Sequence, residues 1–98
     1  MSTKGNFFTV ATVTSTSFSD CRRDFGMGGV SAGIMLLVDS SNVSDEIEYS
    51  FNSTTVHGNL KPGSPNEGIA FDNRHESTVW LRLKNAGRTV NVRVEAWQ

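Results

Sequence analysis

Hydrophobic and polar residues alternate along most of this chain with a period of two, which is typical of β-strands with one buried face. The alternation is most regular in residues 45–60, where two such segments flank a turn. Pairing them places Tyr49 opposite Gly58, and an aromatic ring over a cross-strand glycine covers the gap left by the missing side chain. We therefore predict a β-hairpin with three pairs: Phe51 with Val56, Tyr49 with Gly58, and Ile47 with Leu60.

A second hairpin is predicted at the end of the sequence, from residues 79–84 and 90–96 around a turn at Ala86-Gly87. Pairing Leu83 with Val90 keeps the apolar sets of both strands on one side. The same register places Trp80 opposite Arg93 on the outer side. Four large side chains are thereby expected to share the outward face of this hairpin: Trp80, Arg82, Arg93 and Trp97.

Three further strands are predicted from composition. Residues 6–17 are rich in Thr, Val and Phe with both faces partly apolar, so this strand is expected to be covered on both sides. Residues 34–38 are continuously apolar and are likewise expected to be buried on both faces, and residues 69–71 form a short strand. Charged residues 19–24 and the glycines that follow predict an exposed loop, with at most one helical turn.

These segments give about seven short strands and no convincing amphipathic helix. The prediction is an all-β protein, an antiparallel β-sandwich with Greek-key or jelly-roll-like connections. The length of 98 residues suits a single domain over residues 1–98. The polar residues 1–6 are expected to form a mobile N-terminal arm.

Charge and cysteine content narrow the possible partners. Nine basic and ten acidic residues give a net charge of −1, which argues against a nucleic-acid partner and against an anionic membrane surface. Cys21 is the only cysteine, so no disulfide can form within the chain. The residues after Met1 do not resemble a signal peptide, and synthesis in a reducing cytoplasm is therefore expected.

No pattern in the sequence predicts catalysis or metal binding. Cys21 could pair with His57 or His75 as a nucleophile and base, but no local signature accompanies them. Asp72 and Glu76 beside His75 fit a solvated polar corner better than a metal site. We expect no catalytic residue, no metal and no cofactor.

Exposed Trp and Arg residues on one sheet face are typical anchors of protein–protein interfaces. Trp80, Arg82, Arg93 and Trp97 are therefore the first candidates for an interface. Packing under a loop and a sugar-stacking platform remain alternatives for the same set. The second choice is a glycine-rich loop that lacks the spacing of a phosphate-binding loop, formed by Gly26, Met27, Gly28, Gly29 and Val30.

Five segments, mainly in the C-terminal half of the chain, carry a pattern: Ile47-Glu48-Tyr49-Ser50-Phe51, Val56-His57-Gly58, Phe71-Asp72-Asn73-Arg74, Val79-Trp80-Leu81-Arg82 and the ending Val92-Arg93-Val94-Glu95-Ala96-Trp97. These segments resemble small virion-associated proteins of tailed bacteriophages. The resemblance implies a sandwich in a phage particle, such as a capsid decoration (cement) subunit or a neck, tail or fibre component. It also implies other virion proteins as partners, and symmetric homo-oligomers are the common case.

The expected function is accordingly that of a non-enzymatic virion structural protein, made in the cytoplasm of the host bacterium, that binds neighbouring capsid or neck and tail subunits. The N-terminal arm or the loop of residues 21–30 is expected to dock onto the particle. A carbohydrate-binding sandwich is the alternative, because exposed Trp80 and Trp97 could stack on sugar rings.

Overall fold

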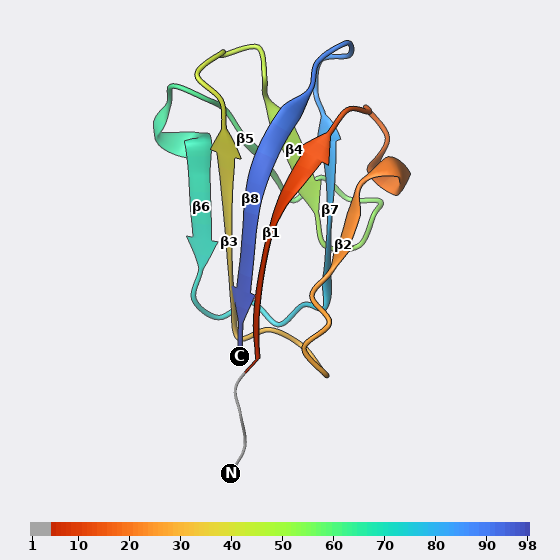
Figure 1. The fold of residues 1–98 in the computed structure, drawn as a ribbon, viewed down its shortest axis with the longest axis vertical. Helices are drawn as coiled ribbons and strands as arrows, with labels where there is room; N and C mark the ends of the chain where they lie inside the picture. Colours follow the sequence, from red (N-terminus) through yellow and green to blue (C-terminus); the bar gives the residue numbers. More distant parts are fainter. Residues whose placement is uncertain (1–4) are drawn as a thin grey trace.

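The protein is an all-β sandwich in the computed structural model, which describes residues 5–98 (Figure 1). Two four-stranded antiparallel sheets face each other. The strands are β1 (Asn6–Val13), β2 (Arg22–Asp24), β3 (Gly33–Asp39), β4 (Ile47–Ser50), β5 (Gly58–Leu60), β6 (Gly68–Phe71), β7 (Thr78–Leu83) and β8 (Val90–Trp97). The described residues also contain two single 3-10 turns, η1 (Phe18–Asp20) and η2 (Pro65–Glu67).

Each sheet draws its strands from both ends of the chain. One sheet has the order β1-β8-β3-β6 and the other has β2-β7-β4-β5. The first strand therefore pairs with the eighth, the second with the seventh, the third with the sixth and the fourth with the fifth. The predicted antiparallel sandwich is confirmed at this level, with eight strands in the described residues where about seven were expected.

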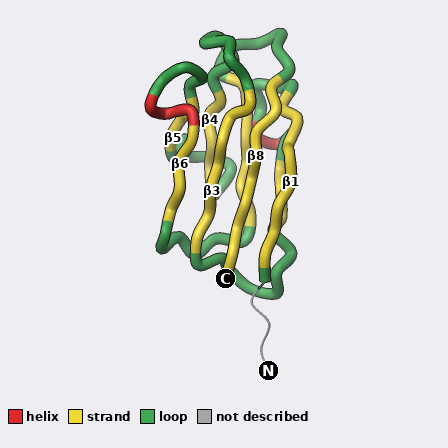
Figure 2. The backbone as a smooth tube through the Cα atoms, turned by 60° about the vertical axis from the view of Figure 1, so that its left-hand side comes forward, coloured by secondary structure: helices red, strands yellow, loops and turns green. Residues whose placement is uncertain are grey.

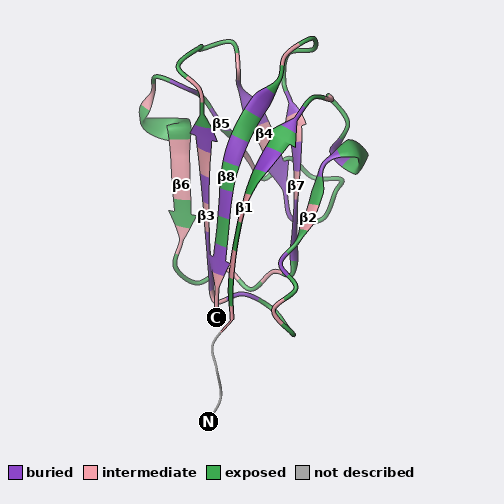
Figure 3. Ribbon diagram, in the orientation of Figure 1, coloured by how far each residue is buried: buried purple, intermediate pink, exposed green. Residues whose placement is uncertain are grey.

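The core lies between the sheets and is built by alternation. Along β8, Val92, Val94 and Ala96 are fully buried while the residues between them are exposed (Figure 3). Ile34 and Leu36 of β3 are equally buried beside them. Burying one such aliphatic side chain stabilises the fold by about 1.5–3 kcal/mol. The period of two in the sequence therefore decides which side of each strand builds the core.

The first predicted hairpin is confirmed in its central pairs. Ile47 lies opposite Leu60, and Tyr49 lies opposite Gly58. The third pair was wrong, because Asn52 ends the ladder. Its side-chain Oδ1 accepts hydrogen bonds from the backbone N–H groups of Thr54 and Thr55, at 3.0 and 2.8 Å, and bends the chain into a loop. In that loop Val56 is exposed, and Phe51 N donates to His57 Nδ1 instead.

The second predicted hairpin was wrong. β7 and β8 follow one another in sequence but lie in opposite sheets, so residues 84–89 cross from one sheet to the other. Both arrangements bury the same alternating residues, and for this reason the pattern could not separate them. Trp80 lies opposite Arg22 and Ser50, whereas Arg93 belongs to the other sheet.

The segment expected to be an exposed loop overlaps one helical turn, η1, which the sequence allowed, and contains an unpredicted strand, β2. The side chains of Arg22 and Asp24 point outward. β2 pairs with β7 and forms a short edge strand of the sheet. Cys21 and Phe25 flank this strand and are buried in the core, each with 3% of its surface exposed. Backbone hydrogen bonds from Leu81 to Cys21 and from Phe25 to Ser77 extend the pairing with β7. The strand was not predicted because its three residues are charged. The buried side chains of Cys21 and Phe25 hold it in place.

The expectation that β1 and β3 are covered on both faces was also wrong. No described segment packs over the outer side of their sheet, which Figure 2 shows running unobstructed from β6 to β1. Phe8 and Val10 of β1 are 60% and 46% exposed there. Met35 and Leu37 of β3 are only half-buried, by their neighbours within the sheet.

The predicted N-terminal arm falls partly outside the described residues, which begin at Gly5. Asn6 is already in β1, and Gly5 is bonded to the other end of the chain. Its N–H donates to Gln98 Oε1 at 3.0 Å, and its carbonyl accepts from Gln98 N at 3.1 Å. Gly5 and Gln98 thus lie side by side at one end of the sandwich, where β1 begins and β8 ends (Figure 1).

Candidate functional site

The outer side of the β1-β8-β3-β6 sheet is not covered by any described segment, and we call it the β8 face. Alternation along each strand, together with the strand register, decides which residues point outward there. They are Asn6, Phe8, Val10, Thr12, Gly33, Met35, Leu37, Asp39, Gly68, Ala70, Asn91, Arg93, Glu95 and Trp97.

Two adjacent rows across the strands form the centre of the β8 face. The Glu95 row consists of Phe8, Glu95, Met35 and Ala70. The Arg93 row consists of Val10, Arg93, Leu37 and Gly68. Each row therefore holds one charged residue with an apolar side chain on either side of it, and the two charges have opposite sign.

The two charges of these rows have no partner in the described part of the chain. Neither Arg93 nor Glu95 forms an ion pair or a side-chain hydrogen bond with any of residues 5–98. Both are exposed on β8. Protein–protein interfaces typically combine apolar residues with charges that are complementary to those of the partner surface.

The two ends of the β8 face differ. At one end the Trp97 ring lies flat over Gly33, where a Cβ atom would overlap the indole. This contact leaves Trp97 half-buried without a covering loop. At the other end Thr12 Oγ1 donates to Asn91 Oδ1 at 2.9 Å, so the patch ends in a polar pair.

The outer side of the β2-β7-β4-β5 sheet is different, because its charges are paired within the chain. Arg82 Nε donates to Glu48 Oε1 at 2.8 Å, and Arg22 Nε lies 2.9 Å from Asp24 Oδ1. Lys84 Nζ lies 3.3 Å from Glu46 Oε2. This sheet face has little unsatisfied charge to offer a partner.

Carboxylates on that side are held in their charged form. Burial raises the pKa of Glu46, but hydrogen bonds from Asn59 and Lys84 outweigh it, so the pKa lies below its usual value. The pKa of Asp24 is lowered by hydrogen bonds from Thr78 and Arg22. The ion pairs of Glu46 and Asp24 are therefore formed at neutral pH.

Trp80 and Arg82 of β7 line an open groove of about 500 Å³ on the same side. The Arg22 guanidinium lies 5.5 Å from the centre of the Trp80 ring, and that of Arg82 lies 4.1 Å from the centre of the Phe18 ring. Hydroxyl groups supply most of the remaining lining: Thr16, Ser17, Ser19 and Ser53. Two of the four predicted interface anchors thus lie partly under the η1 segment.

The sequence-predicted set is accordingly divided between opposite sides of the sandwich. Trp80 and Arg82 share one outer face, and Arg93 and Trp97 share the other. Sequence reasoning missed the apolar residues beside Arg93, among them Phe8 and Met35. Their signal was present, since β1 and β3 carry apolar residues at outward as well as inward positions, but it was attributed to a covering segment.

The glycine-rich loop of residues 26–30 lies at the end of the sandwich where β1 begins and β8 ends. Gly26 and Gly28 have φ values of 63° and 70°, a backbone conformation that favours glycine. Met27 packs against Gly5, and Val30 is 52% exposed while its carbonyl accepts from Gln98 Nε2. The loop is therefore anchored to Gly5 and Gln98 and adjoins the Trp97 end of the β8 face.

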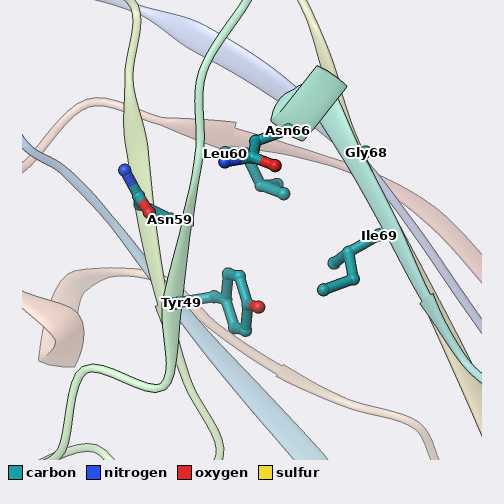
Figure 4. Close-up of a pocket in the computed structure, with 7 residues that line it drawn as sticks. Tyr49, Asn59, Leu60, Asn66, Gly68 and Ile69 are labelled. Atoms are coloured by element: carbon teal, nitrogen blue, oxygen red, sulfur yellow. The ribbon is translucent and has the colours of Figure 1, made fainter. Parts of the chain in front are cut away.

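A small cavity opens between β5 and β6, at the edge where the two sheets separate. Tyr49 and Ile69 face each other across it, with Asn66 above them (Figure 4). Its volume of about 200 Å³ is below the roughly 300 Å³ at which ligand pockets usually begin. We therefore assign it no ligand.

The candidate nucleophile, Cys21, and the candidate bases, His57 and His75, each have a structural role. Cys21 is buried in the core, and burial raises the pKa of its thiol despite the opposing effect of Arg23. His57 accepts a hydrogen bond from the Phe51 N–H, and His75 Nδ1 lies 3.0 Å from the Ser31 carbonyl. Within residues 5–98 no three His, Cys, Asp or Glu side chains converge as a metal site would require.

Comparison of the sequence with models of known protein families and with curated proteins gives no match. The described residues also contain no helix long and apolar enough to span a bilayer. The β8 face is the candidate site that the geometry itself supports.

Proposed function

We propose that this protein is a non-enzymatic structural subunit that holds protein subunits together through the β8 face. The observation that carries the proposal is the uncovered pair of central rows, where Phe8 and Val10 remain exposed beside unpaired charges. Exposed apolar side chains gathered beside unpaired charges on one face are typical of protein–protein contact sites. Following the sequence resemblance, the subunit belongs to a tailed-bacteriophage particle, as a capsid decoration or neck and tail component.

The strand order supports this proposal at the level of fold. We infer a jelly-roll connection from the pairing of the first strand with the eighth, the second with the seventh, the third with the sixth and the fourth with the fifth. Jelly rolls of eight strands occur in viral capsid proteins and in lectins. Because one fold hosts many functions, this is support by analogy, and the β8 face carries the argument.

The proposed partners are proteins, and no catalytic activity is proposed. A buried thiol with a raised pKa is a poor nucleophile, and the ring nitrogen of His57 is occupied by a backbone N–H. The net charge of −1 does not favour nucleic acid or anionic lipid as a partner. The protein is made in the host cytoplasm and ends in the virion.

The test is the presence and attachment of the protein in particles. Phage particles that encode this chain are purified on density gradients, and the protein is quantified by mass spectrometry. We expect a fixed copy number per particle in the wild type and loss of the protein from particles with Phe8→Lys. Val43→Lys is the matched control, because Val43 is 58% exposed and lies outside the β8 face.

Absence of the wild-type protein from purified particles would contradict the virion role. Retention of Phe8→Lys in the particles, or equal loss of Phe8→Lys and Val43→Lys, would contradict a role of the β8 face in holding the protein there. Both variants replace exposed residues, and exposed substitutions change folding stability by only about 0.5 kcal/mol.

A second candidate function, carbohydrate binding, is favoured by the groove beside Trp80, where an indole, two guanidinium groups and several hydroxyls converge. Stacking of a sugar on Trp80 would displace Arg22 from the ring and change the indole fluorescence. Titration of common glycans against Trp80→Phe and the wild type tests this function. A sugar that changes the wild-type emission and not that of the variant would establish it.

A further inference from the structure

The two central rows of the β8 face are complementary to each other. The Glu95 row and the Arg93 row are neighbours, and each consists of one charge between apolar residues. A half-turn that exchanges the rows brings each charge against the opposite charge, and brings apolar groups against apolar groups. A surface with this property matches a second copy of itself.

We propose that two copies of this chain associate face to face through the β8 face, with a two-fold axis running across the strands between the rows. In this dimer β8 crosses antiparallel to β8 of the second copy. Arg93 of each copy faces Glu95 of the other, so the charge pair occurs twice. The proposal specifies the occupant of the interface named above and rests on that proposed function.

The charges select this axis over the alternative one. A two-fold axis running along β8 would keep each row at its own level, so that Arg93 would face Arg93 and Glu95 would face Glu95. Like charges held together in an interface are costly, and this juxtaposition suppresses the wrong arrangement. The apolar residues of the rows supply contact area in both cases, and so the charges determine the orientation.

The size of the face predicts a weak dimer. Four strands about 4.8 Å apart and about seven residues long give a face of roughly 450 Å² per copy. Two copies then bury about 900 Å², below the standard range for stable complexes and within that of transient ones. A buried ion pair adds little net affinity but costs much when one partner is missing or reversed. We therefore expect association that is reversible on dilution and sensitive to charge reversal.

The test is a charge-swap cycle read by light scattering of the full chain between about 10 μM and about 1 mM, where weak association is measurable. For the wild type we expect the mass to rise from that of the 10.7 kDa chain towards twice that value. Arg93→Glu and Glu95→Arg should each raise the dissociation constant about 30-fold or more. The double variant recreates the pairs with exchanged signs, and its dissociation constant should return to near the wild-type value.

Lys61→Glu and Glu67→Arg are the matched controls, because both residues are exposed outside the β8 face and undergo the same changes in charge. We expect wild-type association from both. Restoration in the double variant excludes misfolding as the reason for the loss in either single variant. A wild type that is monomeric at every concentration overturns the dimer, and so do single variants without effect or a double variant that is not restored.

Failure of the dimer and failure of the proposed function give different results. A monomeric protein that still depends on Phe8 for its place in the particle would reject the two-fold contact and keep the β8 face as an interface with another protein. A protein that completes the charge-swap cycle but is absent from particles would keep the dimer and reject the virion role.

Discussion

The Tyr49 ring fills the space above Gly58 in which any other residue would place its Cβ atom. This pair could be predicted from sequence, because alternation within a short hairpin fixes the register of its two strands. Gly58→Ala forces the ring out of this position at the edge of the core. We expect a loss of about 1–3 kcal/mol in the free energy of unfolding, measured by urea denaturation.

The control for this prediction is the same substitution in a Tyr49→Leu background, which removes the ring. If the collision is the cause, Gly58→Ala should cost clearly less in that background, and the difference is the coupling between the two residues. An equal cost in both backgrounds would attribute the effect to the backbone of Gly58 instead.

Asp45 makes the stability of the fold dependent on pH. Hydrogen bonds from Arg88 and Ser40 lower the pKa of its carboxyl below the usual value of 3.8. A lowered pKa in the folded state means that the carboxylate stabilises the fold above the unfolded pKa and that this contribution is lost as the pH falls through the folded pKa. The contribution is therefore complete at neutral pH, begins to decrease near pH 3.8 and is gone only below the lowered pKa of the folded state.

We expect Asp45→Asn to reduce the free energy of unfolding by about 1 kcal/mol at pH 7, since the pair lies near the surface. The difference from the wild type should shrink as the pH is lowered from 4 towards 2. Denaturation curves across this range provide the measurement. A difference that is the same at pH 7 and at pH 2 would show that the charge of Asp45 is not its source.

Among the strands, alternation predicted position and inward side more reliably than it predicted partners. It located β4, β5, β7 and β8 and the residues that each turns towards the core, whereas β1, β3 and β6 were located by composition, without an inward side for β1 or β3. It could not show that β7 and β8 lie in different sheets, since inward residues are the same in a hairpin and in a crossover. The candidate site was divided by that error: Arg93 and Trp97 belong to the β8 face, and Trp80 and Arg82 do not.

The short strand β2 shows where local sequence gives no signal. Its own residues are charged, and its place is decided by Cys21 and Phe25, which are buried on either side of it. Phe25 packs against Phe7 of β1, with 5.4 Å between ring centres. An edge strand held by its flanking residues is defined by tertiary contacts that no pattern of three residues encodes.

Cys21 provides a probe of this edge strand. Its thiol is buried and its pKa is raised, so a thiol reagent can react only after β2 separates from β7. We expect labelling in native buffer to be at least about 100-fold slower than in denaturant, a ratio set by the free energy of opening. A rate close to that of the unfolded chain would contradict the buried position of Cys21.

On the scale of the whole molecule, the two outer faces of the sandwich have different characters. The β2-β7-β4-β5 side satisfies its charges internally, by pairs such as Arg82 with Glu48. The β8 face leaves both Arg93 and Glu95 without partners in the described chain and exposes Phe8 between them and the sheet edge. The charges of the β2-β7-β4-β5 side are satisfied within the monomer, whereas the β8 face has the composition of a contact surface.

The most direct test of this account is a pair of amide NMR spectra of the full chain, recorded at about 20 μM and about 1 mM to span the weak association expected. We expect concentration-dependent shifts confined to the β8 face, strongest at Phe8, Val10, Arg93 and Glu95, with the groove beside Trp80 unchanged. Shifts that cluster around Trp80, or spectra that are identical at the two concentrations, would contradict the claim that the β8 face is where this protein meets its own second copy.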